Sequence, residues 1–98
     1  MIAPIISNAG TLVGTTTISV IWRTNEFSTS KLLFGTSTPL DATASTTPFR
    51  EELTLEKNHR VDLDNLATST TYYLIVESKD ASGNVRRTGE FQATTLAH

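Results

Sequence analysis

The feature that most constrains the fold is a period of two in short segments of the chain. In residues 15–23, Ile18, Val20 and Trp22 alternate with residues that are mostly polar. Successive side chains of a β-strand point to opposite faces, so this alternation predicts a strand with one buried face. Thr and Ser make up about a quarter of the chain, and helix-favouring residues are too scattered to form an apolar helical stripe. The sequence therefore predicts an all-β protein.

Turn residues divide the rest of the chain into six further segments with a similar pattern. These expected strands span residues 4–8, 30–35, 51–56, 59–66, 70–79 and 89–95. Seven short strands in 98 residues predict an antiparallel sandwich of two sheets. The chain is long enough for one core, so we expect a single domain over residues 1–98 with its folded region from 4 to 95.

The inward positions of the expected strands define a predicted core. Trp22 has the largest side chain among them and is expected to anchor it. The predicted members are Ile18, Val20, Trp22, Leu32, Phe34, Val61, Leu63, Leu66, Tyr72, Leu74, Val76 and Phe91.

The composition argues against several classes of function. A net charge of -2 and a pI near 5.5 provide no basic surface for a phosphate backbone, so we expect no nucleic-acid partner. No apolar run is long enough to span a membrane, and the first residues lack the features of a secretory signal. Without cysteine the chain has no disulfide and no thiolate metal site, which does not distinguish one compartment from another.

Candidate catalytic and metal-binding residues are few. Asp62 and Asp64 share the solvated face of a predicted strand, which is an ordinary position for surface charge. His59 falls in an inward register, and we interpret it as a partly buried packing residue. The segment Asp80–Asn84 lacks the ligand spacing of a calcium loop and predicts a hairpin turn with its last two residues at positive φ. We therefore expect no enzyme activity, no cofactor and no metal.

Four stretches of the chain carry a family resemblance. In order they read TISVIW, TNEFSTSKLLFGTS, HRVDLDNLATSTTYYLIVESKDASGN and FQATT. Together they closely resemble fibronectin type III domains, in particular those of bacterial secreted enzymes and cell-surface proteins. The piece STSKLLFGT is also similar to the N-terminal β-sandwich domain of purple acid phosphatases. The resemblance covers nearly the whole chain.

The resemblance implies an immunoglobulin-like sandwich with a defined division into sheets. In the family's lettering, strands A (4–8), B (15–23) and E (59–66) form one sheet. Strands C′ (51–56), C (30–35), F (70–79) and G (89–95) form the other. Tyr72 then corresponds to the tyrosine-corner residue, with its ring in the core and its hydroxyl bonded to backbone in the turn after Leu66. The family often has Pro-Gly in this turn, whereas residues 67–70 read Ala-Thr-Ser-Thr, so we expect a less rigid corner.

The outer face of the sheet that contains strands C, F and G supplies the candidate contact site. Leu33, Tyr73 and Ile75 point outward on adjacent strands and are predicted to form an exposed apolar cluster. The alternative is that residues 49–55 fold beside this sheet and partly cover the cluster.

The residues and their resemblance together predict a non-catalytic spacer or scaffold module in a larger exported, multidomain bacterial protein. The alternative is a recognition module that binds a protein or, with less support, a glycan, through the outer C-F-G face or the loops around Phe27 and Phe49. The expected partners are neighbouring domains of the parent chain or another protein. We expect a monomer, with weak self-association as the alternative. The resemblance implies a location outside the cell or on its surface.

Overall fold

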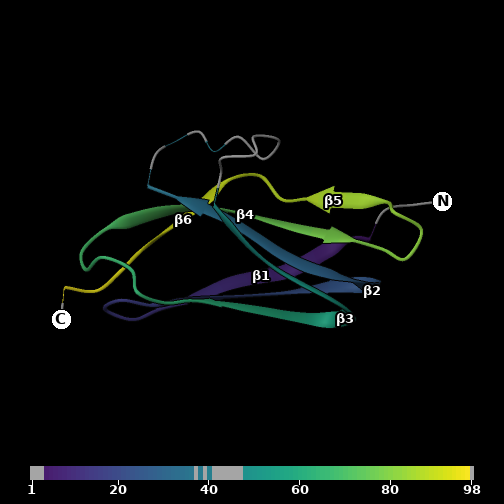
Figure 1. Cartoon of the computed structure of the whole chain (residues 1–98), viewed down its shortest axis with the longest axis horizontal. Coiled ribbons are helices and arrows are strands. Elements are labelled where there is room, and N and C mark those ends of the chain that lie inside the picture. Colours follow the sequence, from purple (N-terminus) through teal and green to yellow (C-terminus); the bar gives the residue numbers. More distant parts are fainter. Residues whose placement is uncertain (1–3, 37, 39, 41–47, 98) are drawn as a thin grey trace.

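The computed structural model describes residues 4–36, 38, 40 and 48–97, and every regular element within them is a β-strand (Figure 1). No helix in these residues is long and apolar enough to cross a membrane. The chain is therefore all-β, as the alternation predicts. Its strands are β1 (Ile6–Val13), β2 (Ile18–Gly35), β3 (Phe49–Leu63), β4 (Thr71–Lys79), β5 (Val85–Arg87) and β6 (Phe91–Thr94).

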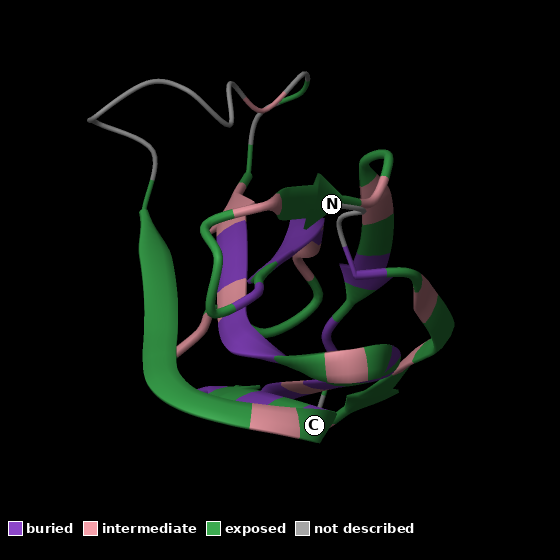
Figure 2. Ribbon diagram, turned by 90° about the vertical axis from the view of Figure 1, so that its right-hand side faces the viewer, coloured by how far each residue is buried: buried purple, intermediate pink, exposed green. Residues whose placement is uncertain are grey.

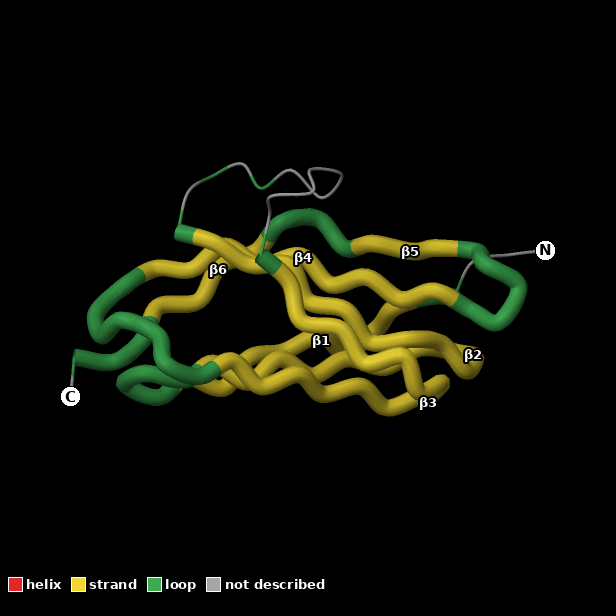
Figure 3. The backbone as a smooth tube through the Cα atoms, viewed as in Figure 1, coloured by secondary structure: helices red, strands yellow, loops and turns green. Residues whose placement is uncertain are grey.

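The strands form two layers that share the two longest strands (Figure 3). β1 pairs with the first part of β2, which pairs in turn with the last part of β3. The second part of β2 pairs with the beginning of β3 and with β4, and β4 pairs with β5 and β6. All of these pairings are antiparallel. They confirm the predicted division into an A-B-E layer and a C′-C-F-G layer.

The described residues form six strands rather than the predicted seven. β2 contains both predicted strands B and C, and β3 contains both C′ and E. The register of β2 against β3 shifts between Arg23 and Ser30, where β2 passes from one layer into the other. The alternation breaks at this bend and so indicates a loop, but pairing continues there through Ser28 and Glu56. β5 is a short strand that the sequence analysis did not predict.

The core lies between the two layers, where the inward side chains meet. Every predicted core residue either belongs to the buried cluster or packs against it. β4 is buried over most of its length, whereas the first half of β3 is exposed (Figure 2). The buried cluster consists of Ile18, Val20, Trp22, Leu32, Val61, Leu63, Tyr72, Leu74, Val76 and Ala93, with Ile6, Phe34, Leu66 and Phe91 packed around it.

The turn before β4 has the geometry of a tyrosine corner. The buried Tyr72 ring places its hydroxyl where it accepts a hydrogen bond from the backbone N–H of Ala67 at 2.9 Å. Threonine hydroxyls hold the rest of the turn. Thr95 Oγ1 donates to the Ala67 carbonyl at 2.6 Å and accepts from the Thr70 N–H at 3.0 Å. These hydrogen bonds hold the turn in the position where the family often has Pro-Gly.

Replacing Tyr72 by phenylalanine is expected to lower the free energy of unfolding by about 1 kcal/mol, because the ring stays in the core and the hydrogen bond to Ala67 is lost. Urea denaturation measures this loss. Tyr73→Phe is the matched control, since the Tyr73 side chain lies on the opposite face of β4, and its midpoint should match that of the unmodified protein. Equal losses in the two variants would contradict the corner.

The segment Asp80–Asn84 forms the predicted turn between β4 and β5. Asp80 Oδ1 accepts hydrogen bonds from the backbone N–H groups of Ser82 and Asn84, at 3.0 and 2.9 Å. Gly83 has the expected positive φ of 89°. The expectation of a positive φ at Asn84 is wrong, because the Asp80 side chain already caps the turn and a second left-handed residue is not needed.

Candidate functional site

The outer C-F-G face does not carry the exposed apolar cluster predicted for it. Leu33 and Ile75 lie opposite each other on β2 and β4 and expose only 2% and 7% of their surface. The expectation of exposure is therefore wrong for both, and Tyr73 alone is partly accessible. Phe49 of β3 pairs with Leu33 on its other side, so that Leu33 occupies a central strand with neighbours on both flanks. Residues 49–55 thus lie beside this sheet, as in the alternative interpretation.

A row of charged side chains crosses the same face next to Leu33. Glu77 of β4 stands between Lys31 of β2 and Arg87 of β5. Its carboxylate accepts a hydrogen bond from Arg87 Nε at 2.6 Å and lies 3.8 Å from Lys31 Nζ. The Glu77 side chain is largely buried and has a cation on each side, so its ion pairs connect β2, β4 and β5 across this face.

β2 and β3 each carry one exposed phenylalanine. Phe27 and Phe49 are both at least half exposed. The Lys57 ammonium lies 5.2 Å from the ring centroid of Phe27, and that of Lys31 lies 4.5 Å from the centroid of Phe49. A cation on one face of each ring competes with a sugar for the same stacking position.

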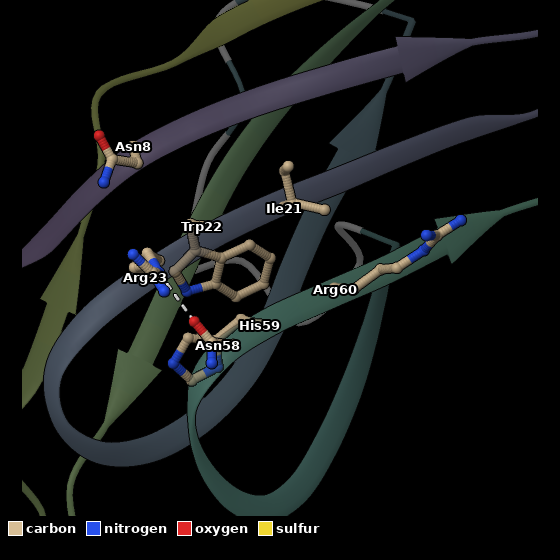
Figure 4. A pocket seen from close by; sticks show the side chains of 7 residues that line it. All are labelled: Asn8, Ile21, Trp22, Arg23, Asn58, His59 and Arg60. Carbon is tan, nitrogen blue, oxygen red and sulfur yellow. Dashed lines mark hydrogen bonds between the residues drawn. The ribbon is translucent and has the colours of Figure 1, made fainter.

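The outer face of the A-B-E layer carries a hollow of about 440 Å³ (Figure 4). Ile21 is 41% exposed on this face and pairs with Arg60 of β3. The Arg23 guanidinium is positioned by Asn58, whose Oδ1 accepts a hydrogen bond from Arg23 Nε at 2.8 Å. The hollow is lined by Asn8, Ile21, Trp22, Arg23, Asn58, His59 and Arg60.

Sequence reasoning missed this hollow. Its one detectable signal is Ile21, an apolar residue in the outward register of a strand whose other outward residues are polar. β1, β2 and β3 bring the lining together from three separate parts of the chain.

Two stacked rings lie at the inner side of this hollow. Trp22 and His59 have ring centroids 5.1 Å apart and an interplanar angle of 9°. Trp22 Nε1 donates a hydrogen bond to Ser78 Oγ at 2.9 Å. His59 Nδ1 lies 2.7 Å from Ser30 Oγ, and its Nε2 lies 2.8 Å from Thr24 Oγ1. Each polar atom of the two rings therefore has a hydroxyl partner inside the protein.

The expectation that His59 is partly buried is wrong, because only 2% of it is exposed. Burial lowers the pKa of His59 below its usual value of 6.5, and the nearby Glu56 carboxylate acts in the opposite direction. The His59 imidazole therefore binds a proton at a higher pH in the unfolded chain than in the folded protein.

Acidification is expected to destabilise the fold through His59. This contribution to stability is complete above pH 6.5 and is lost as the pH falls from there towards the lower folded pKa. Thermal denaturation from about pH 7 to about pH 5 should show a falling midpoint, the range in which histidine titrates. His59→Gln is the control, because glutamine does not titrate, and its midpoint should fall less. Identical pH profiles would contradict the prediction.

The described hydroxyls beside the His59 ring, those of Thr24, Ser28 and Ser30, are all buried. Ser30 and His59 are at hydrogen-bond distance, as a nucleophile and its base would be, but they expose only 1% and 2% of their surface, and both ring nitrogens of His59 already have hydroxyl partners inside the protein.

A pair of carboxyl groups lies near the turn after β4. A hydrogen bond to the Asp80 side chain raises the pKa of Glu26, and burial and the Asp80 charge act in the same direction. The Glu26 carboxyl group therefore holds its proton to a higher pH than an isolated glutamate would. Within residues 4–36, 38, 40 and 48–97, no three histidine or carboxylate side chains gather as metal ligands.

Comparison with known proteins identifies the family and the fold. The family model for the purple acid phosphatase N-terminal domain matches residues 7–95. No curated protein sequence matches the chain. The solution structure of the third fibronectin III domain of the human KIAA0343 protein is similar, with a TM-score of 0.66 at 14% identity, covering 100% of this chain and 84% of that one.

A second solved structure supports the same fold. The fibronectin type III domain of human fibronectin type III domain containing protein 3 has a TM-score of 0.58 at 16% identity, covering 99% of this chain and 84% of that one. Identities this low establish the fold alone, whereas the family model spans nearly the whole chain. The chain therefore belongs to the family of purple acid phosphatase N-terminal domains and has a fibronectin type III-like β-sandwich fold.

Proposed function

We propose that the chain is a non-catalytic spacer or scaffold module of a larger exported, multidomain bacterial protein. The observation that carries this proposal is that the first and last described residues, Pro4 and Ala97, lie toward opposite ends of the longest axis, which measures 44 Å (Figure 1). Neighbours attached to the two ends would be separated by the length of the sandwich. A packed core between two layers keeps that separation constant in a way that a flexible linker cannot.

Two further observations support a non-catalytic role. The matching family is described as the N-terminal domain of a phosphatase, and domains with a fibronectin type III-like fold are generally non-catalytic. The proposed location outside the cell rests on the resemblance of the sequence to domains of bacterial secreted proteins. The proposed partners are neighbouring domains of the parent chain.

Recognition of a glycan or protein through the outer C-F-G face has less support. Leu33 and Ile75 are buried, which leaves Tyr73 as the one partly accessible member of the predicted contact site. Glycan-binding platforms need several exposed ring faces, and a lysine already occupies one face of Phe27 and of Phe49.

A distance measurement tests the spacer role. The domain is placed between two fluorescent proteins, and energy transfer is recorded as urea rises. A spacer holds the transfer efficiency constant until the domain unfolds in a single step. A flexible Gly/Ser linker of equal residue count is the control, and its efficiency should change without a step. A transfer efficiency that varies continuously with urea, with no plateau while the domain is folded, would overturn the proposal.

A further inference from the structure

The outer edge of β1 is an unprotected strand edge. Among the described residues, β1 pairs only with β2, so its other side is open. Residues 1–22 contain no charged side chain, whereas β3 and β5 carry several and β6 is only four residues long. Natural sheets protect their edges with charges or with very short strands. β1 has neither form of protection, and its one bulge, between Ser7 and Gly10, precedes the regularly paired residues 10–13.

The hairpin bond between β1 and β2 shows which backbone groups face this open edge. The N–H of Gly14 donates to the carbonyl of Thr17 at 2.8 Å, which makes Gly14 and Thr17 a hydrogen-bonded pair. Such pairs alternate along an antiparallel ladder, so Leu12 and Gly10 also bond to β2. The N–H and C=O groups of Thr11, which lies between them, therefore point away from β2.

The chain itself bonds to backbone carbonyls just beyond both ends of β1, whereas no described residue bonds to the outward backbone groups of Thr11. At one end the N–H of Leu96 donates to the carbonyl of Gly14 at 2.9 Å. At the other end Arg86 Nε donates to the carbonyl of Pro4 at 3.1 Å. A partner strand is thereby restricted to the stretch around Thr11.

We propose that two copies of the chain associate by antiparallel pairing of β1 with β1 of the second copy, centred on Thr11. In this register each Thr11 exchanges both backbone hydrogen bonds with the Thr11 of the second copy. The contact is isologous, so it closes as a dimer and does not propagate. It joins the two A-B-E sheets into one continuous sheet.

The side chains of the outer face fit this register. Leu12 of one copy lies opposite Gly10 of the other, and Gly10 is itself paired with Ile21. Because glycine has no side chain, the incoming Leu12 reaches across it to Ile21, beside the hollow shown in Figure 4. Leu12 is 63% exposed and Ile21 is 41% exposed in the single chain. Because the dimer is symmetric, the contact between Leu12 of one copy and Ile21 of the other forms twice, and it covers both residues in each copy.

The occupant is a second copy because the edge is complementary to itself. It is uncharged, so two copies meet without repulsion. Its one glycine, Gly10, lies opposite its most exposed large side chain, Leu12. The contact is small, so we expect weak association, with a dissociation constant on the order of 100 µM to 1 mM.

Sedimentation equilibrium over a range of protein concentrations tests the dimer. The unmodified protein should show a monomer–dimer equilibrium. Leu12→Lys should raise the dissociation constant at least about tenfold, because the substitution puts a charge at each contact. Leu53→Lys is the matched control, since Leu53 is a comparably exposed leucine on β3, and it should associate as the unmodified protein does. Thr11→Pro should also abolish association, because it removes an edge N–H that β2 does not use.

Amide resonances recorded on dilution locate the contact. Shifts that change with concentration should be confined to residues 9–13 and the adjacent part of β2. A protein that stays monomeric at millimolar concentration would overturn the proposal. Three other results would overturn it as well. The first is association that persists in Leu12→Lys and Thr11→Pro, the second is weaker association in Leu53→Lys, and the third is a concentration-dependent shift of amide resonances in β3. The circular dichroism spectrum of each variant verifies that the monomer is folded.

Discussion

Replacing Trp22 by alanine is expected to lower the free energy of unfolding by about 3 to 5 kcal/mol. Trp22 is almost completely buried, stacks on His59 and donates a hydrogen bond to Ser78. The substitution removes the ring and leaves the buried hydroxyl of Ser78 without its donor. Domains of this size have total stabilities of about 5 to 15 kcal/mol, so the variant is expected to be close to unfolding at room temperature.

Far-ultraviolet circular dichroism in urea measures this effect, since the variant lacks the tryptophan needed for fluorescence. Phe27→Ala is the control, because Phe27 is an aromatic residue that is 60% exposed, and its loss should cost less than about 1 kcal/mol. Trp22→Phe separates packing from hydrogen bonding, since it keeps a ring and loses the donor to Ser78. A small effect of Trp22→Ala would mean that the core does not depend on this ring.

Replacing Leu33 by alanine is expected to cost about 2 to 5 kcal/mol, the range for leucines truncated in a packed environment. This prediction follows from the burial of Leu33 between Phe49 and Ile75 on the central strand of the C′-C-F-G layer. An exposed contact residue would behave differently, because truncating it leaves the free energy of unfolding within about 0.5 kcal/mol.

Leu53→Ala is the matched control for Leu33→Ala. Leu53 is the same residue type, lies on β3 in the same layer and is 68% exposed. Its unfolding midpoint in urea should equal that of the unmodified protein, whereas that of Leu33→Ala should be clearly lower. Equal and small losses in the two variants would restore Leu33 as a surface residue and with it the predicted contact face.

Local alternation was sufficient to predict most of the strands and the inward residues, although the first strand, predicted at residues 4–8, spans Ile6–Val13. The period of two in Ile18, Val20 and Trp22 depends only on backbone geometry, so it can be recognised without knowing what lies opposite. The same argument assigned Tyr72 to the core and Tyr73 to the other face of β4. It failed at residues 24–29, because a bend within a continuous strand interrupts the alternation while pairing continues through Ser28.

The sites were less predictable than the strands. Strand parity correctly placed Leu33 and Ile75 on the outer face, but their exposure depends on what packs over that face, which parity does not reveal. His59 was assigned an inward direction, yet its complete burial depends on hydroxyls contributed by Thr24 and Ser30 across the bend in β2. The hollow around Ile21 requires three strands to be assembled before it exists.

The sequence by itself determined most of the strand segments, which face of each is apolar, and that Trp22 and Tyr72 belong to the core, because these properties depend on neighbours along the chain. Tertiary structure alone decided how deeply each residue is buried and which strand edges stay open. Both properties depend on pairing between residues far apart in the sequence. For this reason Leu33, predicted to meet a partner, is buried, and the uncharged edge of β1 is exposed.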